Sequence, residues 1–358
     1  MPLHDSTITA GPIPERYARG WHCLGPALKF KDGKPHTVDA FGTRLVVFQG
    51  EDGKLNALDA WCPHMGGDLS HGRIEGSTVV CPFHGWSFGP DGDLKNIPYC
   101  KRLPRKARVG KWHTDEINEG LFVWHDHDGG DPIPGQSLPR LEQCYSAEWS
   151  DVRWAQWTIN INNRELVDNI ADFGHFDTVH GSPPVYFANL FEGHKASQLQ
   201  VGTSERLSGT DPLLTVATYF GPACLFVEMS GAFGDHRIES LLLTCNTPIT
   251  KNSFIINYGV AVKRVPGLTK AENQSLIDTY VRLAQEALTQ DVEIWDNKRR
   301  IDNPVLCEMD GPIYQARKWY DQFFVPVSEV SEESTRVQTY EMDISGGSIR
   351  KPVIRHLR

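Results

Sequence analysis

The chain has 358 residues, of which 40% are apolar and 23% are charged. This composition is typical of a globular protein of about two domains and excludes global disorder. The net charge of −9 argues against a nucleic-acid partner, because such proteins usually carry a basic face. No run of about 18 apolar residues is present, so no transmembrane segment is expected. The N-terminus lacks the basic and apolar regions of a secretory signal, which predicts a cytoplasmic protein.

We expect three segments along the chain: a leader over residues 1–15, an all-β domain over 16–135 and a second domain over 136–358. In the first domain, short apolar runs alternate with turns rich in Gly and Asp, as in the hairpin predicted over 45–58. The Gly- and Pro-rich stretch 129–135 is the best candidate for a linker.

The second domain opens with a predicted helix over 163–172. Three β-like runs follow, over 223–229, 239–245 and 253–262. Residues 269–298 then carry apolar side chains at helical spacing. This order predicts an α+β domain in which a long helix packs across a curved sheet.

Two short motifs in the first domain carry metal-ligand side chains: Cys62-Pro-His64 and Cys81-Pro-Phe-His84. Two Cys and two His can hold a structural zinc ion. They can also hold a Rieske [2Fe–2S] cluster, with both Cys on one iron and both His on the other. A zinc finger usually places both Cys in one loop and both His in another, whereas each loop here is mixed. The spacing therefore favours the Rieske cluster over zinc.

A second candidate metal site contains His175 and His180, which are five residues apart. On a regular helix their side chains would diverge by about 140°. Gly174 and Gly181 predict that the helix breaks here, which lets both rings converge. Two imidazoles and one carboxylate form the facial triad of a mononuclear non-haem iron site.

The third iron ligand must be a carboxylate, and the sequence offers four candidates near the long predicted helix: Asp291, Glu293, Asp296 and Asp302. Asp291 is preferred, because it shares the apolar stripe of Leu288 and Trp295, where an unpaired carboxylate would be costly. Asp172 precedes His175 by three residues, and we expect its carboxylate to accept the Nδ1 proton of that ring.

With these motifs in place, the sequence resembles the α-subunits of Rieske non-haem iron oxygenases over nearly its whole length. Within that family it is most similar to the oxygenase components of 3-ketosteroid 9α-hydroxylases. The supporting stretches are residues 16–25, 122–127, 187–194 and 290–295. The resemblance implies a helix-grip (START-like) catalytic domain with a curved antiparallel sheet and a mononuclear iron. It also implies that the protein uses O2 to hydroxylate a 3-ketosteroid at the 9α position.

The resemblance further implies a homotrimer in which electrons cross between subunits. His84 of one subunit would meet Asp172 of its neighbour, and Asn169 would lie near the mononuclear iron. No dinucleotide-binding glycine motif and no plant-type ferredoxin motif is present. Electrons are therefore expected from a separate NADH-dependent flavin and iron–sulfur reductase, or from a ferredoxin and its reductase.

Apolar and aromatic residues that would suit a large ring substrate gather near the iron motif and on later strands: Phe173, Phe176, Val179, Val185, Tyr186, Phe187, Phe191, Leu225, Val227 and Leu242. Other functions stay open at this point. Cholesterol 7-desaturases share much of the pattern, so desaturation competes with hydroxylation. A Rieske electron carrier and a zinc-stabilised lipid-binding module are more distant alternatives.

Overall fold

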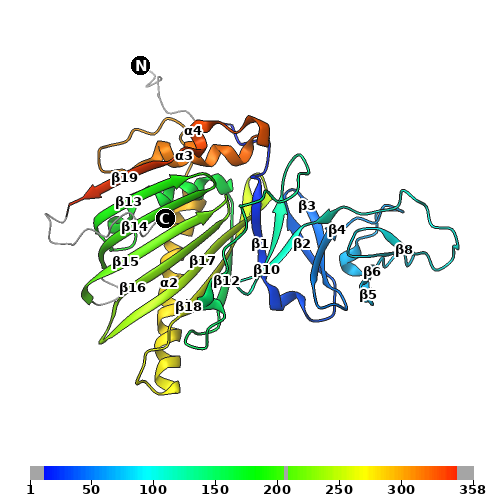
Figure 1. The fold of residues 1–358 in the computed structure, drawn as a ribbon, viewed down its shortest axis with the longest axis horizontal. Coiled ribbons are helices and arrows are strands. Elements are labelled where there is room, and N and C mark those ends of the chain that lie inside the picture. The colour runs from blue at the N-terminus through cyan, green and yellow to red at the C-terminus, as the bar shows by residue number, and fades with distance from the viewer. Residues whose placement is uncertain (1–11, 205–208, 345–358) are drawn as a thin grey trace.

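The structure is a computed structural model that describes residues 12–204 and 209–344. Figure 1 shows a large part built on one broad sheet and a smaller, all-β part beside it. Most of the predicted leader lies outside the described residues. No helix among the described residues is long and apolar enough to cross a membrane.

The smaller part contains three antiparallel sheets joined by tight turns. The first sheet has the order β1 (Gly20–Pro26), β11 (Gly120–His125) and β10 (Thr114–Ile117). The second has the order β2 (His36–Ala40), β3 (Thr43–Gln49), β4 (Leu55–Asp59) and β9 (Lys111–Trp112). The third has the order β5 (Arg73–Glu75), β6 (Thr78–Val80), β7 (Ser87–Phe88) and β8 (Leu94–Asn96). Two 3₁₀ helices, η1 (Ala27–Phe30) and η2 (Leu69–His71), complete this part. The all-β prediction and the predicted hairpin, which is β3 and β4, are confirmed.

The larger part is built on an eight-stranded antiparallel sheet with the order β12-β18-β17-β16-β15-β14-β13-β19. In chain order, its strands are β12 (Arg153–Ile159), β13 (Pro184–Glu192), β14 (Lys195–Ser204), β15 (Gly209–Phe220), β16 (Cys224–Phe233), β17 (His236–Thr250), β18 (Ser253–Val262) and β19 (Gln338–Asp343). The three predicted runs correspond to β16, β17 and β18, and β17 is longer than predicted. The other five strands were not predicted.

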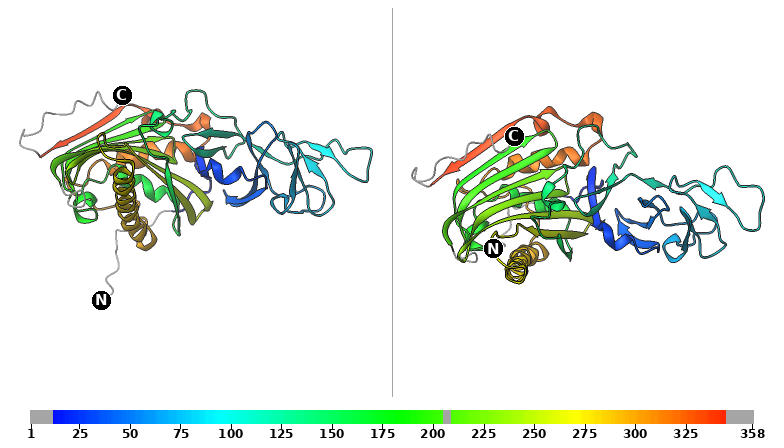
Figure 2. Two further views of the ribbon diagram at one scale, coloured as in Figure 1. Left: turned by 90° about the horizontal axis from the view of Figure 1, so that it is seen from below. Right: turned by 60° about the horizontal axis from the view of Figure 1, so that its bottom comes forward.

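Helix α2 (Lys270–Asn297) packs across the concave face of this sheet (Figure 2). It begins with a capping box, in which Thr269 Oγ1 accepts the Glu272 amide and a Glu272 carboxylate oxygen accepts the Thr269 amide. Such a cap contributes about 1 kcal/mol to helix stability. The buried face of α2 contacts the sheet through Ile277, Tyr280, Val281, Leu288, Val292 and Trp295. The predicted α+β architecture with its long helix is thus confirmed.

The remaining elements of the larger part are short: η3 (Glu142–Cys144), η4 (Asn163–Ile170), α1 (His175–Thr178), α3 (Ile313–Asp321), η6 (Gln322–Phe324), η7 (Val327–Glu329) and α4 (Glu332–Thr335). The helix predicted over 163–172 is therefore the 3₁₀ helix η4, which ends before the iron motif.

The two parts share a buried interface at β1. The Cys23 carbonyl accepts hydrogen bonds from Thr247 Oγ1 and Asn257 Nδ2, both at 2.7 Å. A Cβ on Gly20 would come within 2.4 Å of the Pro222 ring, so the two parts of the molecule approach closely here. The predicted domain boundary after residue 135 falls in the connection between β11 and β12, and it stays a prediction.

Candidate metal centres and the adjoining cavity

The two loops predicted to hold the Rieske cluster have the same backbone hydrogen-bond pattern. The Cys62 carbonyl accepts the Gly66 amide at 2.8 Å, and the Cys81 carbonyl accepts the Gly85 amide at 3.1 Å. Both glycines have φ of 73°, a left-handed conformation that disfavours residues with a Cβ. Each loop therefore bends back on itself and directs its Cys and His side chains toward the other loop.

The side chains at these loop tips combine two buried cysteines with two half-buried histidines. The rings of His64 and His84 lie with their centroids 4.5 Å apart, and both cysteines are buried. Among the described residues, the buried His64 Nδ1 has no hydrogen-bond partner. A Cβ on Gly67 would come within 2.8 Å of the Cys81 sulfur. An unpartnered imidazole nitrogen beside two buried thiols fits a bound cluster, since such a nitrogen would otherwise be costly.

The spread of these four ligands argues against zinc. No three of these four ligands bring their donor atoms within 4.8 Å of one another. Among the described residues, only His175, His180 and Asp291 do so. A single zinc ion holds its ligands at about 2.0–2.3 Å, and therefore within about 4.6 Å of one another. The wider separation suits a cluster of two irons. Burial also raises the pKa of the Cys62 thiol to about 11, so a bound cation is needed to keep this sulfur ionised.

The one compact set of donor atoms is formed by His175, His180 and Asp291. Helix α1 spans only four residues, and His180 lies beyond its end, where Gly181 has φ of 58°. The two rings therefore converge, with centroids 5.4 Å apart. Helix α2 supplies Asp291, whose Oδ1 lies 3.3 Å from His180 Nε2. The structure thus brings together the three residues that the sequence singled out for a mononuclear iron.

The other candidate carboxylates have different surroundings. Asp296 accepts the Asn160 amide at 2.8 Å, and Asp302 forms an ion pair with Arg300 at 2.7 Å. Glu293 is exposed. None of them belongs to the compact set of donor atoms.

Each iron-motif histidine is oriented by a second hydrogen bond. His175 Nδ1 donates to the backbone carbonyl of Asp172 at 2.9 Å, whereas the carboxylate Oδ2 lies 3.6 Å away. The expected bond to the carboxylate is therefore made by the carbonyl of the same residue. His180 Nδ1 lies 3.3 Å from Gln290 Oε1. This role of Gln290 was not predicted, although Gln290 directly precedes Asp291.

The Asp172 carboxylate instead binds the backbone at the start of α1. Its Oδ1 accepts the amides of Gly174 at 3.0 Å and His175 at 3.3 Å. Burial opposes ionisation of this group, but His175 and the two amides outweigh burial and lower the pKa of Asp172. Asp172 is therefore an anion held rigidly beside a predicted iron ligand.

A cavity of about 240 Å³ lies between the concave face of the sheet and α2, and the three predicted iron ligands contribute to its lining. Its wall is largely apolar and comes from β15–β18 and α2, through residues such as Leu213, Leu225, Val227, Met229, Leu242 and Leu288. Strand β14 contributes Gln198, which is 4% exposed. Among the described residues, the buried Gln198 Nε2 has no hydrogen-bond partner.

Only some of the aromatic and apolar residues expected around a substrate line this cavity. Those that do are Phe176, Leu225, Val227 and Leu242. Tyr186 packs in a separate cluster, and Phe191 packs against Trp319 of α3. The expectation was wrong for these two residues. They lie five positions apart on β13 and therefore point to opposite faces of the strand, with Tyr186 in the cluster of Leu199 and Val201 and Phe191 toward α3.

A second, more polar cavity of about 330 Å³ lies on another side of the iron motif. Asn169, Asp172, His175 and Asp291 contribute to its lining. Asn169 also lines the apolar cavity. The predicted catalytic residue Asn169 therefore stands between the two cavities, next to the iron motif.

A buried charge network that was not predicted anchors η4 beside this second cavity. Arg317 donates to both carboxylate oxygens of Asp168, at 2.8 and 2.6 Å. Glu165 is almost fully buried and pairs with Lys298 at 3.2 Å and Arg300 at 3.5 Å. The partners come from distant parts of the chain, so no local motif reveals them.

Two metal centres of these kinds, one on a small β domain and one beneath a helix that crosses a curved sheet, define a Rieske-type oxygenase. The family model described as Rieske [2Fe-2S] domain matches residues 20–107, and the model described as 3-Ketosteroid 9alpha-hydroxylase C-terminal domain matches residues 123–324. The oxygenase component of the 3-ketosteroid-9-alpha-monooxygenase of Mycolicibacterium smegmatis is 46% identical, over 94% of this chain and 90% of that protein. The chain belongs to this family of oxygenase components.

Two further matches are more distant. A cholesterol 7-desaturase of Xenopus laevis is 28% identical, over 88% of this chain and 73% of that protein. The crystal structure of dicamba monooxygenase bound to dicamba has a TM-score of 0.71 at 17% identity, over 86% of this chain and 98% of that chain, which shows a shared fold. As a Rieske oxygenase component, the protein takes a [2Fe–2S] cluster and a mononuclear iron as cofactors, and a separate reductase supplies its electrons.

Proposed function

We propose that the protein is the oxygenase component of a 3-ketosteroid 9α-monooxygenase, which uses O2 and electrons from a separate NADH-dependent reductase to hydroxylate a steroid. The observation that carries this proposal is the apolar cavity between the sheet and α2, lined by the predicted iron ligands and by one unpartnered amide donor, Gln198. The name of the Mycolicibacterium smegmatis relative supports the same substrate class.

The cavity suits a rigid apolar ring system that carries a ketone. Its leucine, valine and methionine side chains offer contact area without polar partners. Gln198 Nε2 is placed to donate to a substrate carbonyl, which would satisfy a donor that is otherwise buried without a partner. About twenty substrate heavy atoms at ~0.3 kcal/mol each give about −6 kcal/mol, which corresponds to a Kd of tens of micromolar.

In this proposal Cys62, His64, Cys81 and His84 hold the cluster, and His175, His180 and Asp291 hold the mononuclear iron. When bound, these groups supply electrons one at a time and activate O2. Asp172 and Gln290 fix the orientation of the two iron-motif rings through the hydrogen bonds to their Nδ1 atoms. Asn169, which lines both cavities, is the proposed polar neighbour of the iron.

We also propose a homotrimer in which His84 of one subunit approaches Asp172 of its neighbour. In Figure 1 the sheet β5–β8, whose β6–β7 connection contains Cys81 and His84, lies at the end of the molecule away from the large sheet and α2. The two predicted metal sites of one chain therefore belong to different ends of the molecule. Contact between neighbouring subunits would bring such sites together.

A single-turnover experiment tests the function. The purified, metal-loaded protein is reduced anaerobically with dithionite, the reductant is removed, a panel of 3-ketosteroids is added, and O2 is admitted. We expect one steroid to gain 16 mass units, with nuclear magnetic resonance placing the hydroxyl on carbon 9. A loss of 2 mass units would identify a desaturase, which the cholesterol 7-desaturase match makes the second candidate. No product from any steroid would contradict the substrate class.

A further inference from the structure

The segment that follows β8 has a charge opposite to that of the rest of the protein. Between residues 99 and 111 there are six basic residues and no acidic ones: Lys101, Arg102, Arg105, Lys106, Arg108 and Lys111. Because the whole chain has a net charge of −9, the rest of the chain carries −15. Among the described residues, Arg108 is the only one of these six with a carboxylate within 4.0 Å, from Asp93 at 3.7 Å. The other five cations therefore have no carboxylate partner in the part of the chain that the structure describes.

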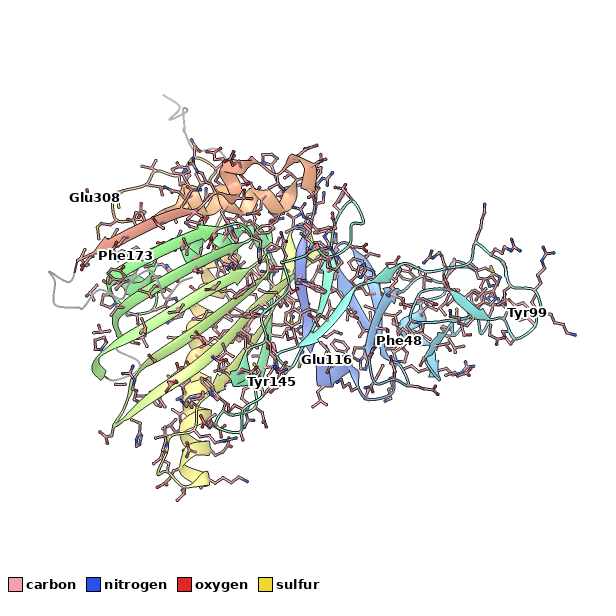
Figure 3. The ribbon with its side chains drawn as sticks, in the orientation of Figure 1. Phe48, Tyr99, Glu116, Tyr145, Phe173 and Glu308 are labelled. Atoms are coloured by element: carbon pink, nitrogen blue, oxygen red, sulfur yellow. The ribbon has the colours of Figure 1, made fainter. Side chains whose placement is uncertain are left out.

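This segment also presents apolar side chains to solvent. Tyr99 is 63% exposed, and Leu103 is 37% exposed. Figure 3 shows Tyr99 at the end of the molecule farthest from the large sheet. We call Tyr99, Leu103 and the six basic residues the basic face. Exposed apolar residues surrounded by charged ones are typical of protein–protein contact surfaces.

The basic face is directly connected to a predicted cluster ligand. Trp86 Nε1 donates to the Tyr99 hydroxyl at 2.8 Å. The Trp86 ring stacks on His64, with centroids 4.4 Å apart and an interplanar angle of 7°. The close approach of the Tyr99 segment to the Cys81–Trp86 loop is also visible at Gly85, where a Cβ would lie 3.0 Å from Pro98. A continuous path of packed aromatic groups thus leads from the exposed Tyr99 to His64.

We infer that the basic face is the docking surface for the external electron donor, a protein whose own surface is acidic around its redox centre. This inference rests on the proposed function. In each encounter the donor is oxidised by one electron and the cluster is reduced by one electron, with Tyr99, Trp86 and His64 along the path. The positive charge attracts the donor and orients it, which raises the association rate at low salt. His84, on the other loop, stays available for a neighbouring subunit.

The test measures cluster reduction directly, without steroid or O2. The probe is the reductase that serves the Mycolicibacterium smegmatis relative, reduced with NADH and mixed anaerobically with the metal-loaded oxygenase, and the absorbance of the cluster is followed. The variant Lys101→Glu/Arg105→Glu/Lys106→Glu reverses three charges of the basic face. The control variant, Lys34→Glu/Lys270→Glu/Arg336→Glu, makes the same change in net charge at exposed sites on other elements.

We expect the second-order rate constant for reduction to fall at least tenfold in the basic-face variant at low salt. The difference from wild type should shrink at high salt, where the Debye length is about 3 Å. The control variant should stay within about twofold of wild type. Single turnover by the dithionite-reduced variant should be unchanged, which shows that the variant is folded and loaded. Equal loss in both variants, or no loss in the basic-face variant, would overturn the inference. If no steroid is hydroxylated while reduction still depends on the basic face, the substrate proposal fails and this inference stands.

Discussion

Replacing Gln198 with Leu should have opposite effects on the empty protein and on the complex with substrate. In the described structure the Gln198 Nε2 is buried without a partner, and an unsatisfied buried donor costs about 1–3 kcal/mol. Leucine has a similar size and removes that donor, so the ligand-free variant should be more stable than wild type. At the lower limit of about 1 kcal/mol, the melting temperature should rise by about 2 °C.

Substrate binding by the same variant should weaken. A hydrogen bond between uncharged groups contributes about 0.5–1.5 kcal/mol, which corresponds to about a two- to tenfold rise in Kd. The loss should be confined to steroids that carry the ketone, because only they use the donor. A steroid pair that differs only in this carbonyl would therefore be distinguished by wild type and bound alike by Gln198→Leu.

The assay combines thermal melts of ligand-free protein with titrations of the two steroids. The matched control is Gln200→Leu, because Gln200 lies two residues along β14, is equally buried and lines the same cavity. We expect Gln200→Leu to preserve the discrimination between the two steroids. A variant Gln198→Leu that melts below wild type and still prefers the ketone would refute the assignment of Gln198 as the carbonyl donor.

Three further predictions concern the metal site and the stability of the fold. Asp291→Asn should lower the mononuclear iron content at least tenfold and leave the absorbance of the Rieske cluster unchanged, as metal analysis and visible spectra would show. Arg317→Met leaves the carboxylate of Asp168, which is 13% exposed, without its bidentate partner. Lys298 stays 3.7 Å from this carboxylate, so the loss of the two charge-assisted hydrogen bonds should lower the free energy of unfolding in urea by about 1.5–3 kcal/mol; a loss below about 1 kcal/mol would contradict the role given to this pair. Burial lowers the pKa of His22 to about 3 and that of His125 to about 4, whereas both titrate near 6.5 in the unfolded chain. The unfolded state therefore binds more protons below pH 6.5, and stability falls as the pH drops from 6.5 toward 4. At pH 5 each ring should cost about 2 kcal/mol, and urea titrations at pH 7 and pH 5 that agree would contradict this.

The Rieske loops were predictable because their geometry is local. Each loop closes a short turn through a hydrogen bond between a cysteine carbonyl and the amide four residues later, as from Cys62 to Gly66. Spacing and glycine placement therefore encode most of the arrangement. The break between His175 and His180 was predictable for the same reason, since glycines flank the short helix.

The missed features have three different causes, and only one of them is a contact between distant segments. Strand β14 was not recognised, because Gln198 and Gln200 point toward the cavity and give the core-facing side of the strand a polar pattern. The expected partner of His175 was the Asp172 carboxylate, but that group caps α1, and the Asp172 carbonyl accepts the hydrogen bond from His175 Nδ1 instead. Asp168 and Arg317 are 149 positions apart in the sequence, and no periodic pattern predicts a contact between residues so far apart.

The two metal centres therefore differ in what the fold contributes to them. Two adjacent loops supply every predicted cluster ligand, so this site depends mainly on the small β domain. The predicted iron ligands come from α1, from the turn after it and from Asp291 of α2, so this site forms only when α2 packs on the large sheet. The same packing encloses the cavity that we assign to the substrate. Iron binding and substrate binding thus both depend on the packing of α2 on the sheet, whereas the path from Tyr99 through Trp86 to His64 does not depend on it.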